Sequence, residues 1–195
     1  MEIAINTSFV YNIISGQAML RSTTPAFETL GDLPTGCWKA VASDASGQYL
    51  FAASALVCPT VAVKPKHKYK NVTSWPSSGS IYVTSNYGKH WAQTGPQGDR
   101  QDFVDIAVSV KGQNIVAIAS NSRVLYSLNF GFSWTLSSNS PILSYSSVTS
   151  SNSGMKVIVA APYANAKPAS CEGFDFSTAG LWMSMDYGQN FTRDE

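Results

Sequence analysis

The sequence predicts an all-β protein made of repeated four-stranded antiparallel units. A short motif occurs three times, each time between two apolar runs of strand length, at 84–91, 127–134 and 184–191. A longer pattern of apolar run, Gly-containing turn and apolar run also recurs, at 38–53, 104–119 and 145–160. Together they describe strand, turn, strand, loop, strand, turn, strand, repeating after 43 and 57 positions. Such a unit is typical of a β-propeller blade. Only 13% of the residues are charged, which suits a turn-rich β protein.

The N-terminal segment, residues 1–37, is the least regular. Residues 10–22 and 27–30 align with later strands of the middle unit, and an innermost strand is expected over residues 2–6. Residues 23–26 have neither the Asn or Asp nor the Gly of the motif, so its turn is missing there. The segment is either a degenerate, shortened blade or an irregular arm, and we favour the blade.

Three regular units follow, assigned with the N-terminal segment to one domain: 38–95 with a long loop 55–78, 102–137, and 145–192 with a loop 162–178. The first hairpin of the middle unit is expected to be one residue shorter at its turn than the other two. About four blades are few for a closed ring, because each blade buries both faces against neighbours. We therefore expect an incomplete propeller, completed by self-association or by blades of a longer chain.

Each motif has a hydroxyl residue, an Asn or Asp, a Gly and a large aromatic at fixed positions: Thr84, Asn86, Gly88 and Trp91; Ser127, Asn129, Gly131 and Trp134; Ser184, Asp186, Gly188 and Phe191. The Asn or Asp can accept hydrogen bonds from turn amides, and Gly readily adopts a positive φ. The hydroxyl can bind the turn backbone, and the final aromatic can pack on a neighbouring element. We therefore expect structural roles for these residues in three hairpin turns, called the motif turns below.

The motif resembles the Asp-box, or bacterial neuraminidase repeat, of sialidases, sortilin-type receptors, photosystem assembly factors and several glycosidases. Asn86 and Asn129 stand where the family has Asp, which keeps the acceptor oxygen and drops the charge. The resemblance covers residues 38–192 and implies a propeller of the sialidase-like superfamily. Propellers with this repeat include receptors, assembly factors and enzymes, so the resemblance selects no single function.

The loops 55–78 and 162–178 are expected on the face opposite the motif turns, because each joins the second strand of a unit to the third. By the resemblance, related propellers bind substrates or partners on that face. Candidate binding residues come from a lysine-rich run and nearby aromatics: Lys66, Lys68, Tyr69, Trp75 and Tyr163. A solvated loop is the simpler interpretation of the lysines.

We assign no catalytic residue, although Glu172 and Asp175 are candidates for a glycosidase, which needs two carboxylates flanking the scissile bond. Loop carboxylates serve solubility or turn formation more often. A complete sialidase site is not expected. By the resemblance it needs three arginines, and none of the four present follows the family's Arg-Ile-Pro pattern: Arg21, Arg100, Arg123 and Arg193.

Composition and spacing exclude several functions. The net charge of +1 gives no pull toward nucleic acid or acidic membranes, and no apolar run is long enough to span a bilayer. No signal peptide is seen, and the compartment stays unassigned. His67 and His90 lack metal-ligand spacing, and no cofactor motif is present, so neither a metal nor a cofactor is expected. For Cys37, Cys58 and Cys171 we favour free thiols; a Cys58–Cys171 disulfide would suit a secreted chain.

The first functional hypothesis is a non-enzymatic scaffold that presents both loops to a protein or glycan. One alternative is a glycoside hydrolase of the Asp-box propeller type, of which this chain is a fragment or lobe. Another is a non-functional fragment of a larger propeller. Under either functional hypothesis, deleting residues 55–78 is expected to spare folding and to remove binding or activity.

Overall fold

The computed structural model describes the backbone of three N-terminal strands and residues 32–33, 37–55, 79–95, 101–161 and 179–193. Contacts divide the chain into two units, residues 1–30 and 31–195. In the first unit, three strands form an antiparallel sheet in sequence order: β1 (Glu2–Ala4), β2 (Val10–Ile14) and β3 (Gln17–Arg21). The strand expected over residues 27–30 lies outside the described residues.

The second unit contains three sheets, each of four antiparallel strands in sequence order. The first blade is β4 (Trp38–Ser43), β5 (Leu50–Ser54), β6 (Ile81–Thr84) and β7 (Ala92–Thr94). The second is β8 (Phe103–Val108), β9 (Ile115–Ala119), β10 (Leu125–Ser127) and β11 (Thr135–Leu136). The third is β12 (Ser147–Ser150), β13 (Val157–Ala161), β14 (Gly180–Ser184) and β15 (Thr192–Arg193). The predicted all-β class with four-stranded antiparallel blades is confirmed. The described residues contain no helix, and hence none that could cross a membrane.

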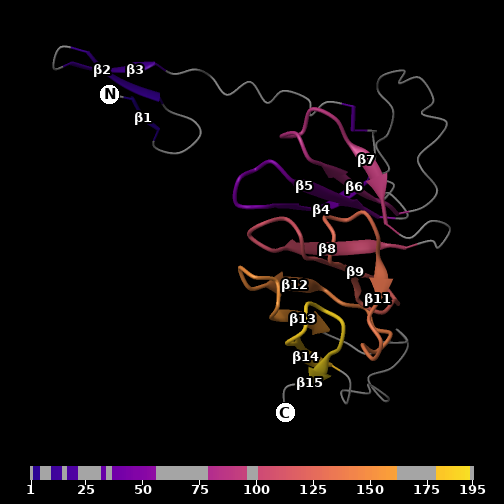
Figure 1. The fold of residues 1–195 in the computed structure, drawn as a ribbon. Helices are drawn as coiled ribbons and strands as arrows, with labels where there is room; N and C mark the ends of the chain where they lie inside the picture. Colours follow the sequence, from indigo (N-terminus) through magenta and orange to yellow (C-terminus); the bar gives the residue numbers. More distant parts are fainter. Residues whose placement is uncertain are drawn as a thin grey trace, which may run out of the picture. The chain divides into compact units, whose positions relative to one another are not determined.

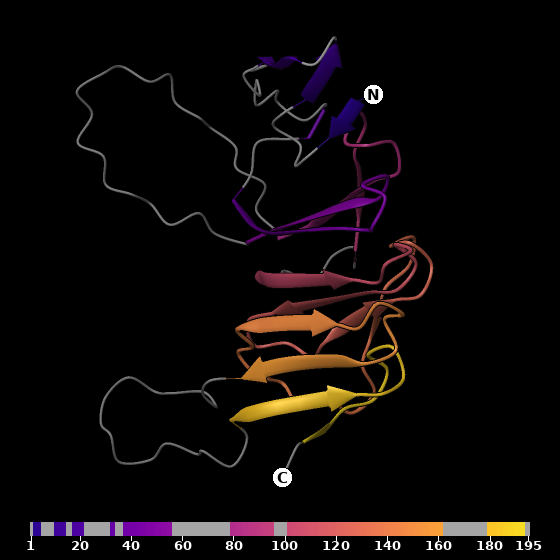
Figure 2. The same cartoon turned by 90° about the vertical axis from the view of Figure 1, so that its left-hand side faces the viewer.

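The three blades pack face to face in sequence order (Figure 1). Their first strands are neighbours, because β8 contacts both β4 and β12. Figure 2 shows the sheets stacked, with the hairpin turns gathered along one side. Contact between successive blades through their first strands is the packing of a propeller.

Two hydrophobic cores fill the spaces between the blades. The core between the first and second blades contains Phe51, Ile81, Ile106, Ile115 and Leu125. The core between the second and third contains Val116, Val124, Val148, Val157 and Phe191. All five residues of β9 are buried, because this inner strand of the middle blade has a neighbouring blade on each side. The apolar residues of the repeats therefore bury the blades against one another.

The first hairpins of the three blades have turns of equal length, closed by Ser43 with Leu50, Val108 with Ile115, and Ser150 with Val157. The expectation of a shorter middle turn is therefore wrong. By sequence alone, Ser43, Ser109 and Ser150 align at the same position of the repeat. The strand register shows instead that Ser109 is equivalent to Asp44 in the first blade and Ser151 in the third. Each of these three side chains accepts a hydrogen bond from the amide five residues later, at 3.0–3.1 Å. Residues 43–54, 108–119 and 150–161 are thus equivalent, position by position.

Cys37, just before β4, is disulfide-bonded. The sequence-based preference for free thiols is therefore wrong for this cysteine. Cys58 and Cys171 lie outside the described residues. The odd number of cysteines and their irregular spacing gave no indication that Cys37 takes part in a bond.

Candidate functional site

The three motif turns share one hydrogen-bond network. In the turn 84–91, Oγ1 of Thr84 accepts from the amide of Gly88 (3.2 Å) and donates to Oδ1 of Asn86 (2.8 Å). That Oδ1 atom accepts from the amide of His90 (3.0 Å). The same three bonds recur at 2.9–3.0 Å in the turn 127–134 and at 2.8–2.9 Å in the turn 184–191. These polar atoms are thus engaged within the turns and shape the surface that a ligand would meet.

The residue before each motif glycine also has a positive φ, which the sequence analysis did not expect. Tyr87, Phe130 and Tyr187 have φ of 60–65°, followed by glycines with φ of 82–86°. A bulky residue in the left-handed region is uncommon and needs support from its surroundings. Part of that support is a hydrogen bond from each of these amides to a backbone carbonyl in the first hairpin turn of the same blade, at 3.0–3.2 Å. Backbone hydrogen bonds therefore join the two turns of each blade.

Two polar residues outside the motif hold a motif turn against a preceding segment. Asn139 accepts from the amide of Phe191 (2.8 Å) and donates to its carbonyl (3.1 Å). Asp32 accepts from the amide of Trp91 (2.7 Å) and lies 3.5 Å from the imidazole of His90. Sequence reasoning missed both residues. Their only signal is an Asn or Asp 52 or 59 positions before the final motif aromatic, which has no local counterpart.

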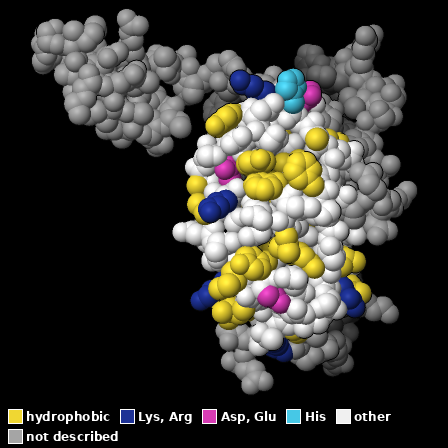
Figure 3. Space-filling model, in the orientation of Figure 1, with side chains coloured by type: hydrophobic (Ala, Val, Ile, Leu, Met, Phe, Trp, Pro, Cys, Tyr) yellow, Lys and Arg dark blue, Asp and Glu magenta, His cyan; other side chains and the backbone are white. Residues whose placement is uncertain are grey.

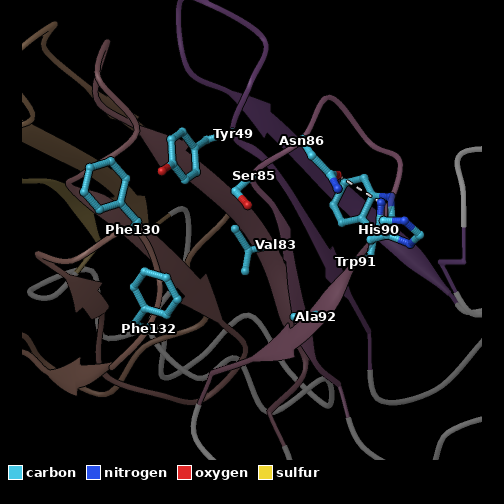
Figure 4. Close-up of a pocket in the computed structure, with 9 residues that line it drawn as sticks. All are labelled: Tyr49, Val83, Ser85, Asn86, His90, Trp91, Ala92, Phe130 and Phe132. Atoms are coloured by element: carbon cyan, nitrogen blue, oxygen red, sulfur yellow. Dashed lines mark hydrogen bonds between the residues drawn. The ribbon is translucent and has the colours of Figure 1, made fainter.

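A pocket of about 240 Å³ lies between the motif turns of the first and second blades, lined by Tyr49, Val83, Ser85, Asn86, His90, Trp91, Ala92, Phe130 and Phe132. Figure 4 shows Tyr49, Phe130 and Phe132 on one side and Trp91 with His90 on the other. The Tyr49 and Phe130 rings pack with centroids 4.8 Å apart. This is a concave, mainly apolar site with a few polar groups, the usual form of a binding pocket.

The pocket is fixed to its scaffold but open to solvent. The Thr94 hydroxyl of the first blade donates to the carbonyl of Gly131 and accepts from the indole of Trp134 (3.1 Å). These two hydrogen bonds join the first blade to the second next to the pocket. By contrast, the side chain of Phe132 is 80% exposed. The space-filling view shows hydrophobic side chains gathered in clusters on the face it presents, and lysine and arginine only scattered (Figure 3). An exposed aromatic on a rigid turn is suited to contact a ligand.

A second pocket, of about 370 Å³, is formed by the first hairpin turns of the second and third blades. Six of its seven lining residues have polar or charged side chains: Ser109, Val110, Lys111, Gln113, Asn114, Asn152 and Ser153. Several of these groups already bind each other. Ser109 accepts from the amide of Asn114 (3.0 Å), and the Asn114 side chain donates to the carbonyl of Ser153 (2.9 Å). We therefore regard the aromatic pocket as the stronger candidate.

Two carboxylates near the motif turns have shifted pKa values. The hydrogen bond from the amide of Trp91 is the main cause that lowers the pKa of Asp32. At Asp186, desolvation raises the pKa, but hydrogen bonds from Asn190, Ser184 and Gln189 outweigh it and hold the pKa below the ordinary value. Both carboxylates therefore stay charged and support the turns. Among the described residues, no cluster of three or more His, Cys, Asp or Glu side chains could hold a metal ion.

The predicted loop sites lie outside the described residues: Lys66, Lys68, Tyr69, Trp75, Tyr163, Glu172 and Asp175. The base of the first loop is described. Ser54 donates its amide to the carbonyl of Ser80 (2.9 Å), and the Ser54 hydroxyl accepts from the amide of Ser80 (3.0 Å). These ends belong to β5 and the residue before β6, at the strand ends opposite the motif turn. The two residues that flank the loop region, Ser54 and Ser80, are therefore held together by hydrogen bonds.

No protein-family model and no curated protein matches the sequence. Solved structures match the fold. The GH74 enzyme of Niastella koreensis has a TM-score of 0.57 at 14% identity, covering 100% of this chain and 23% of that chain. A chain of a nidogen/laminin complex has a TM-score of 0.55 at 10% identity, covering 95% and 56%. YCF48 from Cyanidioschyzon merolae has a TM-score of 0.53 at 12% identity, covering 83% and 38%. YCF48 bound to a D1 peptide matches with a TM-score of 0.51.

These structures are β-propeller proteins, and at such low identity the likeness shows the fold alone. The chain spans 23% of the GH74 enzyme and 38% of YCF48. Together with the three four-stranded sheets, they define the class of this chain as a propeller built from four-stranded antiparallel blades. The class includes both enzymes and binding proteins, so function must be argued from the site.

Proposed function

We propose that this chain is a non-enzymatic scaffold that binds a protein ligand. The pocket between the motif turns 84–91 and 127–134 would receive an aromatic or aliphatic side chain of that ligand. The observation that carries the proposal is a pocket walled by aromatic rings, one of them 80% exposed, with no carboxylate in its lining. A site without carboxylates lacks the acid pair that glycoside hydrolysis needs.

Two of the aromatic side chains at this pocket, Phe132 and Tyr49, are not required by the turns themselves. The position of Phe132, directly after the motif glycine, is Lys89 and Gln189 in the other two turns. The position of Tyr49 is Asn114 and Lys156 in the other blades. Since the turns also form with polar residues at these positions, the highly exposed Phe132 is explained better by a ligand than by folding, whereas Tyr49 also packs against the core between the first and second blades.

Proteins of this fold include protein binders. The nidogen structure is a complex with laminin, and the YCF48 structure is bound to a D1 peptide. Both support a protein ligand as the first choice for this chain. A glycan is the second choice, because aromatic rings such as Trp91 and Phe132 also stack on the apolar faces of sugars.

The loops 55–78 and 162–178 form the second proposed contact surface, on the face opposite the motif turns. The residues proposed for it are Lys66, Lys68, Tyr69, Trp75 and Tyr163. Because the amide of Ser54 reaches the carbonyl of Ser80 at 2.9 Å, replacing residues 56–78 by a short Asn-Gly turn should leave both strands paired. The shortened chain therefore separates binding through this loop from binding through the aromatic pocket.

The test is a selection of random phage-displayed peptides on the immobilised chain, followed by anisotropy titration of the enriched peptides. The enriched peptides should carry aromatic or aliphatic anchors. Phe132→Ala should weaken their binding about 30-fold, since truncating an aromatic hot spot costs about 2 kcal/mol. Lys89→Ala, at the equivalent turn position outside the pocket, is the matched control and should leave the affinity unchanged. Equal affinities for wild type and Phe132→Ala would refute the pocket assignment.

The hydrolase alternative has a separate test, because its candidate acids are Glu172 and Asp175 on the second loop. Release of chromophore from a panel of aryl glycosides, lost in Glu172→Gln or Asp175→Asn, would establish it. Hydrolysis that survives both substitutions would exclude these two acids as the catalytic pair. No release from any glycoside, together with peptide binding that depends on Phe132, is the result expected from a scaffold.

A further inference from the structure

Equivalent residues of the repeat form the interface between the first and second blades and the interface between the second and third. We call the side that a blade turns toward the following blade its trailing face. Two trailing positions are equivalent through strand register: Phe51, Val116 and Ile158; and Ile81, Val124 and Leu181. In the first two blades these side chains are 0–2% exposed. In the third blade Ile158 is 37% and Leu181 is 50% exposed. Among the described residues, none covers the trailing face of the third blade, although the equivalent face is buried in the first two blades.

We call the opposite side of a blade its leading face. On this face it is the first blade, and not the third, whose apolar residue is exposed. Val41, Ile106 and Val148 are equivalent residues of the first strands β4, β8 and β12. Ile106 is 4% and Val148 is 7% exposed, because each packs on the trailing face of the preceding blade. Val41 of the first blade is 76% exposed. Among the described residues of the second unit, none covers the leading face of the first blade, whose positions are equivalent to those that pack on a trailing face elsewhere.

Backbone contacts at the hairpin turns repeat in the same direction. The amide of Ala45 donates to the carbonyl of Val110 (3.0 Å), and the amide of Val110 donates to that of Asn152 (2.8 Å). The surroundings of the turn glycines follow the same order of blades. A Cβ added to Gly154 would lie 2.7 Å from Cβ of Asn114 in the preceding blade, whereas one added to Gly47 would meet no atom within 4 Å. The turn of the first blade therefore has room for a preceding turn, and the series of bonds can be extended at both ends.

We propose that the trailing face of the third blade docks on the leading face of the first blade in a second copy of this chain. The chain itself carries both halves of the contact, and its two internal interfaces join equivalent positions of the repeat. The contact is heterologous, joining different surfaces of two identical chains. Ile158 and Leu181 of one copy would lie against Val41 and the turn 84–91 of the next, as Val116 lies under Gly188 within the chain. The amide of Asn152 would donate to the carbonyl of Ala45.

The test measures the solution mass of the full chain by light scattering across a dilution series. Wild type should show the mass of two or more chains when concentrated and approach one chain on dilution. Val41→Asp and Ile158→Asp each place a charge on one end face and should hold the chain at the mass of one copy. Both side chains are already exposed, so both variants should fold, which an unchanged thermal melt of the dilute protein confirms. Ile142→Asp, 58% exposed between β11 and β12, is the matched control and should associate as wild type does.

Mixing the two monomeric variants gives the sharper result. Val41→Asp keeps a native trailing face and Ile158→Asp keeps a native leading face, so a differently labelled mixture should form a mixed pair that neither variant forms alone. A wild type that stays at one chain at every concentration overturns the proposal, as does association that both variants leave unchanged. A mixture that stays apart also overturns it. A monomer whose melting temperature falls only in Val41→Asp would show that a segment of the same chain covers the leading face, and would refute a second copy.

Discussion

The equivalent glycines Gly47 and Gly154 allow the contact between successive blades to be weighed by itself. Each follows the same hairpin position, and their φ angles are +72° and +77°. The amide of each donates to the carbonyl three residues earlier, at Asp44 and Ser151. The two sites differ in what surrounds them: Cβ of Asn114 lies 2.7 Å and that of Ser109 3.0 Å from a Cβ built on Gly154, while the space beside Gly47 is open. Alanine at each position therefore adds one methyl group to the same backbone in two different environments.

The expected magnitudes follow from this difference. A left-handed alanine costs about 1–2 kcal/mol at either site, and the restriction of the unfolded chain is common to both. Only in Gly154→Ala does the new Cβ also push against the Cβ atoms of Asn114 and Ser109. Such overpacking costs about 1–3 kcal/mol more. The free energy of unfolding should therefore fall by about 1–2 kcal/mol in Gly47→Ala and by about 2–5 kcal/mol in Gly154→Ala.

Urea unfolding followed by tryptophan fluorescence measures both effects. Both substitutions are made in the Ile158→Asp background, so that no second copy can cover Gly47. With a typical dependence of about 2 kcal/mol per molar urea, the two midpoints should differ by about 0.5–1.5 M. Equal midpoints would refute the argument, because they would mean that the blades do not meet at this turn or that the turn gives way without cost.

Further predictions address the motif turns and the segments that hold them. Gly131→Val should lower the free energy of unfolding by about 2–5 kcal/mol, because φ is +82° and the new Cβ lies 3.3 Å from Phe51; an unchanged urea midpoint would contradict the turn geometry. Asn139→Ala should cost about 1–3 kcal/mol in the same assay, since the amide of Phe191 loses its acceptor. For Asp186, hydrogen bonds hold the folded pKa below 3.8, so its stabilising contribution is present above the unfolded pKa and is lost as the pH falls through the folded value. Asp186→Asn keeps the acceptor oxygen, and its melting temperature should fall less steeply than that of wild type in acid. Tyr145→Phe should cost about 1 kcal/mol, measured by thermal melts, because the phenol donates to the carbonyl of Pro141 (2.7 Å).

The sequence predicts the blades well because their determinants are local. The hydroxyl, the Asn or Asp and the Gly of a motif lie within five positions of one another, and their hydrogen bonds close within the same turn. Short apolar runs likewise mark most of the strands. The error in the middle hairpin has a physical origin, because turn length depends on which residues pair across it, and a serine at 109 does not reveal that Val108 closes the turn.

The site could not be predicted in the same way, because its contacts join distant segments. Asp32 meets Trp91 across 59 positions, and Asn139 meets Phe191 across 52. Tyr49 and Phe130 come from different blades and meet only when those blades stack. The predicted sites lay in the long loops instead, since loop length is readable from the sequence and packing between blades is not.

The repeat separates the residues that build this fold from those free to serve a ligand. At positions of the motif network the three turns agree, and the side chains bind their own backbone. At the position after the motif glycine they differ, with Lys89, Phe132 and Gln189. A phenylalanine there is 80% exposed and contributes little to the cores, so folding does not account for it. Function on this face should therefore follow the departures from the repeat, and the aromatic departures meet in a single pocket between the first and second blades.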